Sequence, residues 1–330
     1  ELGYRLVPLI VALRAVSPEM DLACVPEVGR RILQAAGAGE RVLQRGPGPF
    51  GIIEAYHPYM GALPRVLREG RGAVHVDRAT NIAASQAANA KTFRRAHDAL
   101  DRFCADTGFR YRVFIEHALG RGEAVRQRMA RGPAGLQYVG ADLEDAAIDA
   151  AMASGDMPDD MVFVRNADIG RPDTLLAGMG DIPSEGAVLM VGNGFHEVRG
   201  QTDERMVEVF RGYEEAGLLL LFTEESALSV DDLLETAWNT YHAGFKYVHE
   251  RSGQGLRPAS PALPSAFGGP LPASWVECAT RAGYVYADRY CARSRTIYPT
   301  TPPSGHNPSI SVTHFFVPHR IAARVGMGDG

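Results

Sequence analysis

Short apolar runs alternate with helix-like stretches through the middle of the chain, and this alternation is the strongest constraint on its fold. Buried strands of a parallel sheet have continuous apolar runs, and the connecting helices cover the two faces of the sheet. The pattern therefore predicts an α/β protein with a doubly wound sheet. The five runs lie near residues 112–116, 136–141, 161–165, 187–192 and 218–222, and the helix-like stretches between them lie near residues 123–131, 144–154, 172–179 and 203–216.

Polar residues stand at the ends of four of these runs. Glu116 closes the first run, Asp142 and Asp168 follow the second and third, and Asn193–Glu197 follows the fourth. In open α/β sheets, ligands bind outside the carboxyl ends of the strands. We therefore predict that these residues surround one ligand.

The segments on either side of this alternation have a different pattern. Residues 1–108 are predicted to be mostly helical, with the longest helix over residues 80–107, and to form a helical N-terminal cap that belongs to the substrate region. Residues 109–320 are predicted to form the ligand-binding domain. An insertion near residues 229–272 adds a helix and an irregular passage to the substrate region.

Two further strands are predicted close to the end of the chain. They cover Tyr284–Tyr290 and Ile310–Val317, and a proline-rich loop joins them. A helix predicted at Trp275–Ala282 precedes the first of the two. These strands would extend the parallel sheet beyond its fifth member.

Charge, hydropathy and cysteine usage exclude several classes of protein. A formal net charge of −5 argues against a broad electrostatic grip on nucleic acid, and no apolar run reaches the length of about 18 residues that spans a bilayer. The four cysteines share no Cys-x-x-Cys spacing, and no Cys/His cluster has metal-ligand spacing, so no metal is expected. No signal-peptide layout is visible, and we expect a cytoplasmic protein without a nucleic-acid or membrane partner.

The turn after the first run carries Gly120 and Gly122, which allow the backbone to approach a ligand closely. A dinucleotide fingerprint requires a third small residue, where this chain has Val125. Glu116 would also repel a pyrophosphate. A cationic adenosine derivative without phosphate fits this turn better, and S-adenosyl-L-methionine carries both an ammonium and a sulfonium group.

Residues 109–317 resemble a class I (Rossmann-type) S-adenosylmethionine-dependent methyltransferase. The family's first motif, acid-x-Gly-x-Gly-x-Gly, is matched by Glu116, Gly120 and Gly122, with Ala118 at the first glycine. The resemblance implies a seven-stranded Rossmann-like methyltransferase sheet with an antiparallel last strand, and S-adenosyl-L-homocysteine as the product. It implies cofactor contacts at Glu116, Gly120, Gly122, Asp142 (ribose), Leu143, Asp168 (adenine), Ile169, Asn193 and Tyr56.

A narrower resemblance rests on the Asn193–Glu197 turn, the helical cap and Trp238–Gly244. These segments are similar to actinomycete enzymes that methylate antibiotics, in particular the gentamicin-pathway aminosugar N-methyltransferases. This resemblance implies secondary metabolism and N-methylation of an amine on an aminosugar or aminoglycoside-like acceptor.

The acceptor atom must lose a proton, so a base is expected close to the transferred methyl group. Glu197 and His196 are the leading catalytic candidates, and His242 is the third. His196 could equally be a packed turn residue, and Glu197 a first-turn acid that the helix dipole favours. The candidate substrate contacts are Phe195, Tyr241, Glu224 and Asn89.

Several alternatives stay open at the level of sequence. The chain could O-methylate a hydroxylated secondary metabolite, or it could be a methyltransferase-like binding protein without catalysis. Metal-dependent O-methylation and nucleic-acid methylation are less favoured. The sequence also leaves a homodimer open.

Overall fold

The computed structural model describes residues 62–69, 78–226, 255–258, 272–296 and 309–327. Contacts divide the chain into two compact units, residues 1–88 and residues 89–330. The boundary falls within α6 (Arg78–Thr107), which confirms the long helix predicted over residues 80–107. The first unit also contains α5 (Leu63–Glu69). The helix predicted within the insertion lies outside the described residues.

The second unit is built on one mixed sheet of eight strands. Its order is β3-β2-β1-β4-β5-β8-β6, and β7 pairs with β8 beside this path. The first five strands are parallel, whereas β8 runs antiparallel to both β5 and β6. The strands are β1 (Val113–His117), β2 (Gln137–Ala141), β3 (Val162–Val164), β4 (Val188–Gly192), β5 (Leu219–Glu225), β6 (Tyr284–Tyr286), β7 (Ala292–Thr296) and β8 (Ser309–Pro318).

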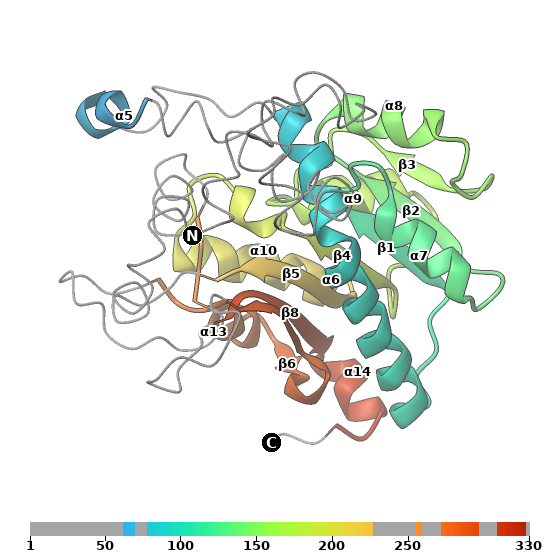
Figure 1. Ribbon diagram of the computed structural model, residues 1–330. Coiled ribbons are helices and arrows are strands. Elements are labelled where there is room, and N and C mark those ends of the chain that lie inside the picture. The colour runs from blue at the N-terminus through green and yellow to red at the C-terminus, as the bar shows by residue number, and fades with distance from the viewer. Residues whose placement is uncertain (1–61, 70–77, 227–254, 259–271, 297–308, 328–330) are drawn as a thin grey trace, which may run out of the picture. The chain divides into compact units, whose positions relative to one another are not determined.

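Helices cover both faces of this sheet, which confirms the doubly wound arrangement (Figure 1). One face packs against α9 (Pro172–Met179), α10 (Asp203–Glu215) and α13 (Trp275–Arg281). The other face packs against the second half of α6 and three further helices. These are α7 (Glu123–Arg131), α8 (Asp145–Ala153) and α14 (His319–Arg324).

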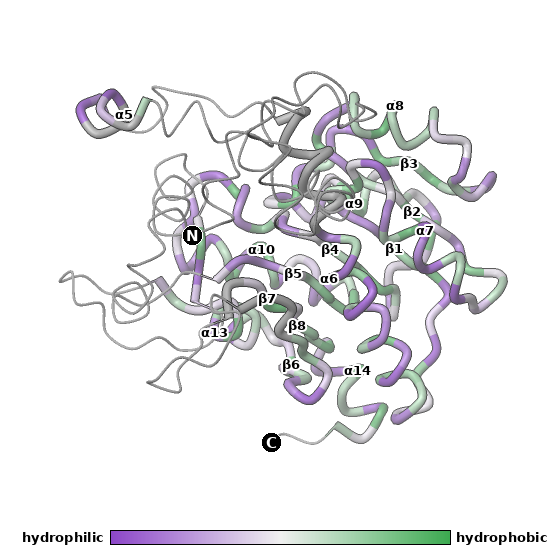
Figure 2. The backbone as a smooth tube through the Cα atoms, viewed as in Figure 1, coloured by the Kyte–Doolittle hydropathy of each residue, from purple (hydrophilic) through white to green (hydrophobic). Residues whose placement is uncertain are grey.

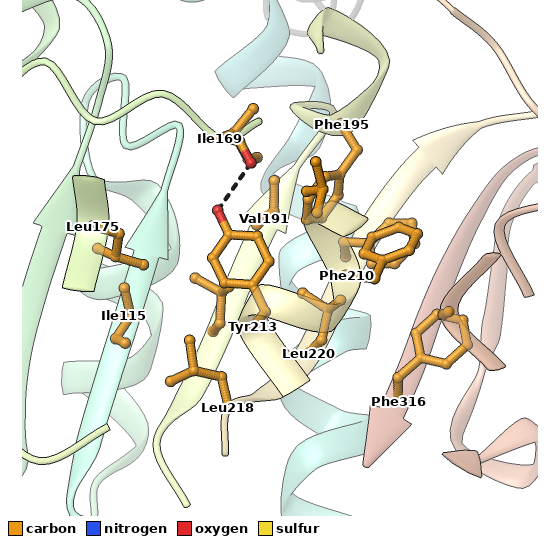
Figure 3. Packing of buried hydrophobic residues seen from close by; sticks show 14 of the residues in the cluster. Ile115, Ile169, Leu175, Val191, Phe195, Phe210, Tyr213, Leu218, Leu220 and Phe316 are labelled. Carbon is orange, nitrogen blue, oxygen red and sulfur yellow. Dashed lines mark hydrogen bonds between the residues drawn. The ribbon is translucent and has the colours of Figure 1, made fainter. Parts of the chain in front are cut away.

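The strands are buried because apolar side chains point to both faces. In Figure 2 the central strands lie mostly at the hydrophobic end of the scale, while the helices alternate between the two ends. Tyr213 of α10 lies in the core between the sheet and the helices α9, α10 and α13. Its hydroxyl donates to the carbonyl oxygen of Ile169 in the turn after β3, at 3.0 Å (Figure 3). A buried phenol needs such a partner, and the bond fixes that turn against α10.

The end of the sheet differs from the prediction in two details. The strand predicted at Tyr284–Tyr290 stops at Tyr286, because the chain turns into a short 3-10 helix at Asp288–Tyr290. The following residues form β7 against β8, where a loop was predicted. The sheet therefore contains the seven predicted strands, the last of them antiparallel, and β7 is an eighth.

Candidate active site

Three turns at the carboxyl ends of the parallel strands hold non-glycine residues in the left-handed backbone region. Among the described residues these are Ala118 after β1, Asn166 after β3 and Asn193 after β4, with φ of 58°, 53° and 55°. Such conformations cost about 1–3 kcal/mol each and gather at functional sites. The structure therefore marks this edge of the sheet as the candidate site.

The turns after β1, β3 and β4 converge on Gly194. A methyl group on Gly194 would lie 2.9 Å from Cδ1 of Ile169 and 3.3 Å from Cβ of Ala118. It would also lie 2.8 Å from Cγ1 of Val191. Only a glycine allows these turns to pack so closely.

Glu116 lies beneath the turn after β1. Its Oε1 and Oε2 accept hydrogen bonds from the amides of Ala124 and Val125, at 3.2 and 2.8 Å. These amides belong to the first turn of α7, where main-chain donors have no partner inside the helix. Burial raises the pKa of Glu116 to about 8, against the opposing effect of the two amides. Both oxygens of this carboxylate hold the glycine turn to α7, and its predicted contact with a cationic ligand stays a prediction.

Asp142 joins the turn after β2 to the turn after β1. Its Oδ2 accepts from the amide of Gly120 and its Oδ1 from the amide of Glu144, both at 3.0 Å. Burial raises the pKa of Asp142, and the backbone hydrogen bonds oppose that rise. Carboxylates therefore occupy amides of the kind that cradle a pyrophosphate in dinucleotide-binding folds. This edge suits an unphosphorylated ligand, as the sequence predicted.

Two apolar residues flank these carboxylates at the same edge. Leu143 follows Asp142 and leaves 39% of its surface exposed, which is unusual for a leucine in this part of the chain. Ile169 follows Asp168, whose Oδ1 accepts from the amide of Gly170 at 2.8 Å. The exposed leucine provides an apolar surface that a flat base could cover, and its predicted cofactor contact stays a prediction.

Asn193 connects the end of β4 to α6. Its side-chain Nδ2 donates to Oδ1 of Asn89 at 2.8 Å, and its backbone amide donates to the carbonyl of Thr223 at 2.7 Å. The sequence assigned Asn193 to the cofactor and Asn89 to the substrate. The structure brings the two side chains together at one end of the sheet.

A buried imidazole and two carboxylates form the most polar cluster of the site. His196 lies in the short helix Phe195–Glu197 after β4, and its Nδ1 is 2.7 Å from Oε2 of Glu224 on β5. Its Nε2 lies 3.6 Å from Oε1 of Glu197. Oε1 of Glu224 also accepts from the amide of Phe195 at 2.6 Å and from that of His196 at 3.4 Å.

Burial lowers the pKa of His196, but the charges of Glu224 and Glu197 and their hydrogen bonds outweigh it and raise the pKa to about 10. The ring is therefore an imidazolium at neutral pH. Because Nδ1 is held by Glu224, the ring keeps one orientation and exchanges protons through Nε2. The structure thus places both predicted catalytic residues, His196 and Glu197, in one cluster.

Two predicted substrate contacts are fully buried. Glu224 lies beneath the turn, where it pairs with His196. Phe195 packs edge-on against Phe210 (Figure 3) and against Phe222. A charge and a large ring in these positions hold the turn in place, and their substrate contacts stay predictions.

Sequence reasoning missed a set of polar contacts that hold the backbone of Phe195 and His196. The buried guanidinium of Arg257 donates to Oε1 of Gln201 at 3.0 Å and to Oδ1 of Asp203 at 2.6 Å. The side-chain amide of Gln201 donates to the carbonyl oxygen of Phe195 at 2.8 Å. The backbone amide of Gly255 donates to the carbonyl oxygen of His196 at 2.9 Å. Arg257 and Gln201 are 56 residues apart, and Arg257 lies in a passage without hydrophobic periodicity. No local pattern in the sequence could therefore have indicated their contact.

The remaining predicted site residues, Tyr56, Tyr241 and His242, lie outside the described residues. Within the described ranges, no group of three His, Cys, Asp or Glu side chains could hold a metal ion. A search of the same residues finds no helix that is long and apolar enough to cross a membrane.

Comparison with known proteins identifies the type of fold. No family model matches the chain, and no curated protein matches its sequence. Among solved structures, it is similar to the CurJ carbon methyltransferase, at 9% identity and a TM-score of 0.50 over 86% of this chain and 71% of that one. This likeness and the strand order show the Rossmann-like methyltransferase fold.

Other solved structures resemble the chain at lower TM-scores. An O-methyltransferase family protein from Burkholderia thailandensis is 16% identical, with a TM-score of 0.46 over 82% of this chain and 72% of that one. The CMeT domain of the citrinin polyketide synthase is 14% identical, with a TM-score of 0.40 over 63% of this chain. The match spans 46% of that protein's chain. Other neighbours are described as S-adenosylmethionine-dependent methyltransferases.

Proposed function

We propose that this chain is an S-adenosylmethionine-dependent methyltransferase that acts on a small molecule. The observation that carries the proposal is the buried His196–Glu224 pair at the ends of β4 and β5, in a methyltransferase fold. A histidine oriented by a carboxylate is a common arrangement for removing a proton from a nucleophile.

The residues at the sheet edge fit the proposed cofactor. S-adenosylmethionine has no phosphate, and carboxylates already occupy turn amides that a phosphate would require. Asp142 and Asp168 would hold the ribose and the adenine amino group, and Leu143 and Ile169 would cover the base. When bound, this cofactor supplies a methyl group on a sulfonium. The glycine turn allows close approach of the backbone to it.

We assign to His196 the removal of the proton from the acceptor atom. Its Nδ1–H keeps its hydrogen bond to Glu224, while its Nε2 faces Glu197, whose side chain is 31% exposed. Once the imidazolium has lost its Nε2 proton and Glu197 has moved aside, Nε2 can accept a proton from the acceptor atom. A base with a pKa of about 10 matches weakly acidic groups such as phenolic hydroxyls. An alkyl ammonium has a pKa close to that of lysine, about 10.4, so water can supply a small neutral fraction that reacts without an enzyme base, whereas a hydroxyl needs one. We therefore place a hydroxyl acceptor first.

An amine on an aminosugar, which the sequence predicted, is the second candidate. The observation that favours it is the pair of carboxylates, Glu197 and Glu224, on the two sides of the His196 ring. Carboxylates attract an ammonium group. The same site would hold the amine before it loses its proton.

Label transfer from radioactive S-adenosylmethionine tests both candidates. Wild type and His196→Ala should be assayed with matched panels of hydroxylated metabolites and aminoglycosides. We expect transfer to a hydroxyl acceptor and a loss of about 10²-fold or more in the variant. Transfer only to amines, with no effect of the variant, would establish the second candidate. No transfer and no calorimetric binding of S-adenosylhomocysteine would support a binding protein without this cofactor and would reject the proposal.

A further inference from the structure

His117 is the last residue of β1, and its imidazole is 1% exposed. The amide of Ala118 donates a hydrogen bond to Nδ1 of this ring at 2.9 Å. That nitrogen therefore carries no hydrogen. Burial lowers the pKa of His117 to about 4, so the ring is neutral at physiological pH and holds its hydrogen on Nε2. Among the described residues, this Nε2–H donor has no hydrogen-bond partner.

A buried donor without a partner is destabilising, and such groups in a native structure need an explanation. The neighbouring Ala118 adds backbone strain, because its φ of 58° suits glycine better than alanine. Two unfavourable features thus adjoin at the end of β1. A ligand that accepts a hydrogen bond from Nε2 would remove the first of them.

The position of His117 indicates which part of a ligand it would meet. Side chains alternate along a strand, so His117 faces the same side of the sheet as Val113 and Ile115, toward α9 and α10. The turn after β3 lies on this side. Gly194 contacts both Ala118 and Ile169, the residues that follow His117 and Asp168. The charge of Asp168 is close enough to oppose the lowered pKa of His117.

The two side chains therefore offer a donor and an acceptor at the same edge of the sheet. Adenine offers the complement on one edge, where the amino group is a donor and the neighbouring ring nitrogens are acceptors. We propose, on the basis of the proposed function, that His117 Nε2–H donates to an adenine ring nitrogen while Asp168 accepts from the amino group. His117 is then a specificity-determining residue for the adenosine part of the cofactor.

Calorimetry with S-adenosylhomocysteine and its 1-deaza and 7-deaza analogues tests this contact without any turnover. Each analogue replaces one ring nitrogen by a C–H group, which cannot accept a hydrogen bond. Wild type should bind one of the two analogues about 3- to 10-fold more weakly than the parent, as expected for a single neutral hydrogen bond. This measurement needs no variant and is independent of any folding defect.

Two substitutions then assign the effect to His117. His117→Asn keeps an acceptor for the Ala118 amide and removes the far donor, whereas His117→Gln places an amide N–H near the position of Nε2. The Asn variant should bind the parent as weakly as wild type binds the disfavoured analogue, with no further loss for that analogue. The Gln variant should restore most of the preference.

The outcomes separate this inference from the function on which it rests. If wild type binds all three ligands equally, or if the Asn variant keeps the wild-type preference, His117 does not contact adenine and the methyltransferase proposal stands. An equal loss for every ligand in both variants would indicate a structural role and would overturn the inference. Failure of wild type to bind S-adenosylhomocysteine would overturn both proposals.

Discussion

The turns after β1 and β4 both rest on a buried carboxylate that accepts hydrogen bonds from consecutive backbone amides. Glu116 accepts from the amides of Ala124 and Val125, and Glu224 accepts from those of Phe195 and His196. The same device therefore anchors both turns. They differ in what else the carboxylate holds.

Main-chain amides take up both oxygens of Glu116, and no ion pair with it occurs among the described residues. The two amides and the charge of Arg126 oppose the effect of burial on the pKa of Glu116, but burial outweighs them and raises the pKa to about 8. Glu224 gives one oxygen to the imidazole of His196, whose pKa rises to about 10. The comparison shows that a turn-anchoring acid becomes chemically useful when one oxygen meets a titratable ring.

The largest expected effect is that of Glu224→Gln on methyl transfer. The amide cannot balance the imidazolium, so the pKa of His196 should fall from about 10 toward its ordinary value. A base acts in its unprotonated form, so the wild-type rate should rise with pH up to about 10. In the variant this rise should occur at lower pH, with a maximal rate lowered by about 10²-fold or more. Rates of label transfer between pH 6 and 10.5 measure both changes.

Glu116→Gln is the matched control for that experiment. Its site is equally buried and equally bound to amides, but it holds no ring. We expect the pH at which the rate rises to be unchanged in this variant. A shift of the same size in both variants would mean that the two acids act alike, and would contradict the comparison.

A smaller effect is expected for the stability of Glu116→Gln as a function of pH. The folded pKa of about 8 lies above the ordinary glutamate pKa of 4.5, so the folded state keeps this proton to higher pH than the unfolded state does. Wild-type stability should therefore fall relative to the variant as pH rises from 4.5 to 8, by at most about 1.4 kcal/mol per pH unit. Urea unfolding at pH 5 and pH 8 measures the difference.

Glu208→Gln serves as the control for stability, because Glu208 is an exposed acid on α10 with 63% of its side chain accessible. Its cost should be small and the same at both pH values. If the stability difference for Glu116→Gln were also independent of pH, the buried carboxylate would titrate as it does in the unfolded chain. Its burial would then be balanced by contacts other than the two amides.

The sheet could be predicted from the sequence because burial on both faces leaves continuous apolar runs, and the polar residues at their ends identify the binding edge. The direction of a side chain at that edge could not be predicted. Glu116 and His117 are adjacent in β1 and point to opposite faces of the sheet. Glu116 binds the amides of α7 because α7 packs on the face to which Glu116 points, and the sequence does not show on which face α7 packs. Arg257 and Gln201 were invisible for a different reason, since their contact joins distant irregular segments.

The smallest effect concerns the one non-glycine residue in each of these two turns that has a left-handed backbone conformation, Ala118 after β1 and Asn193 after β4. Ala118→Gly should stabilise the protein by about 1 kcal/mol, since it relieves the strain at φ 58° and removes no hydrogen bond. Asn193→Gly should destabilise it by a similar amount, because the bond to Asn89 is lost while asparagine already tolerates φ 55°. Ala147→Gly in α8 is the control for the entropy of an added glycine and should cost about 1 kcal/mol. If Ala118→Gly cost as much as this control in urea unfolding, the turn after β1 would hold no strain, and only the turn after β4 would depend on its particular side chain.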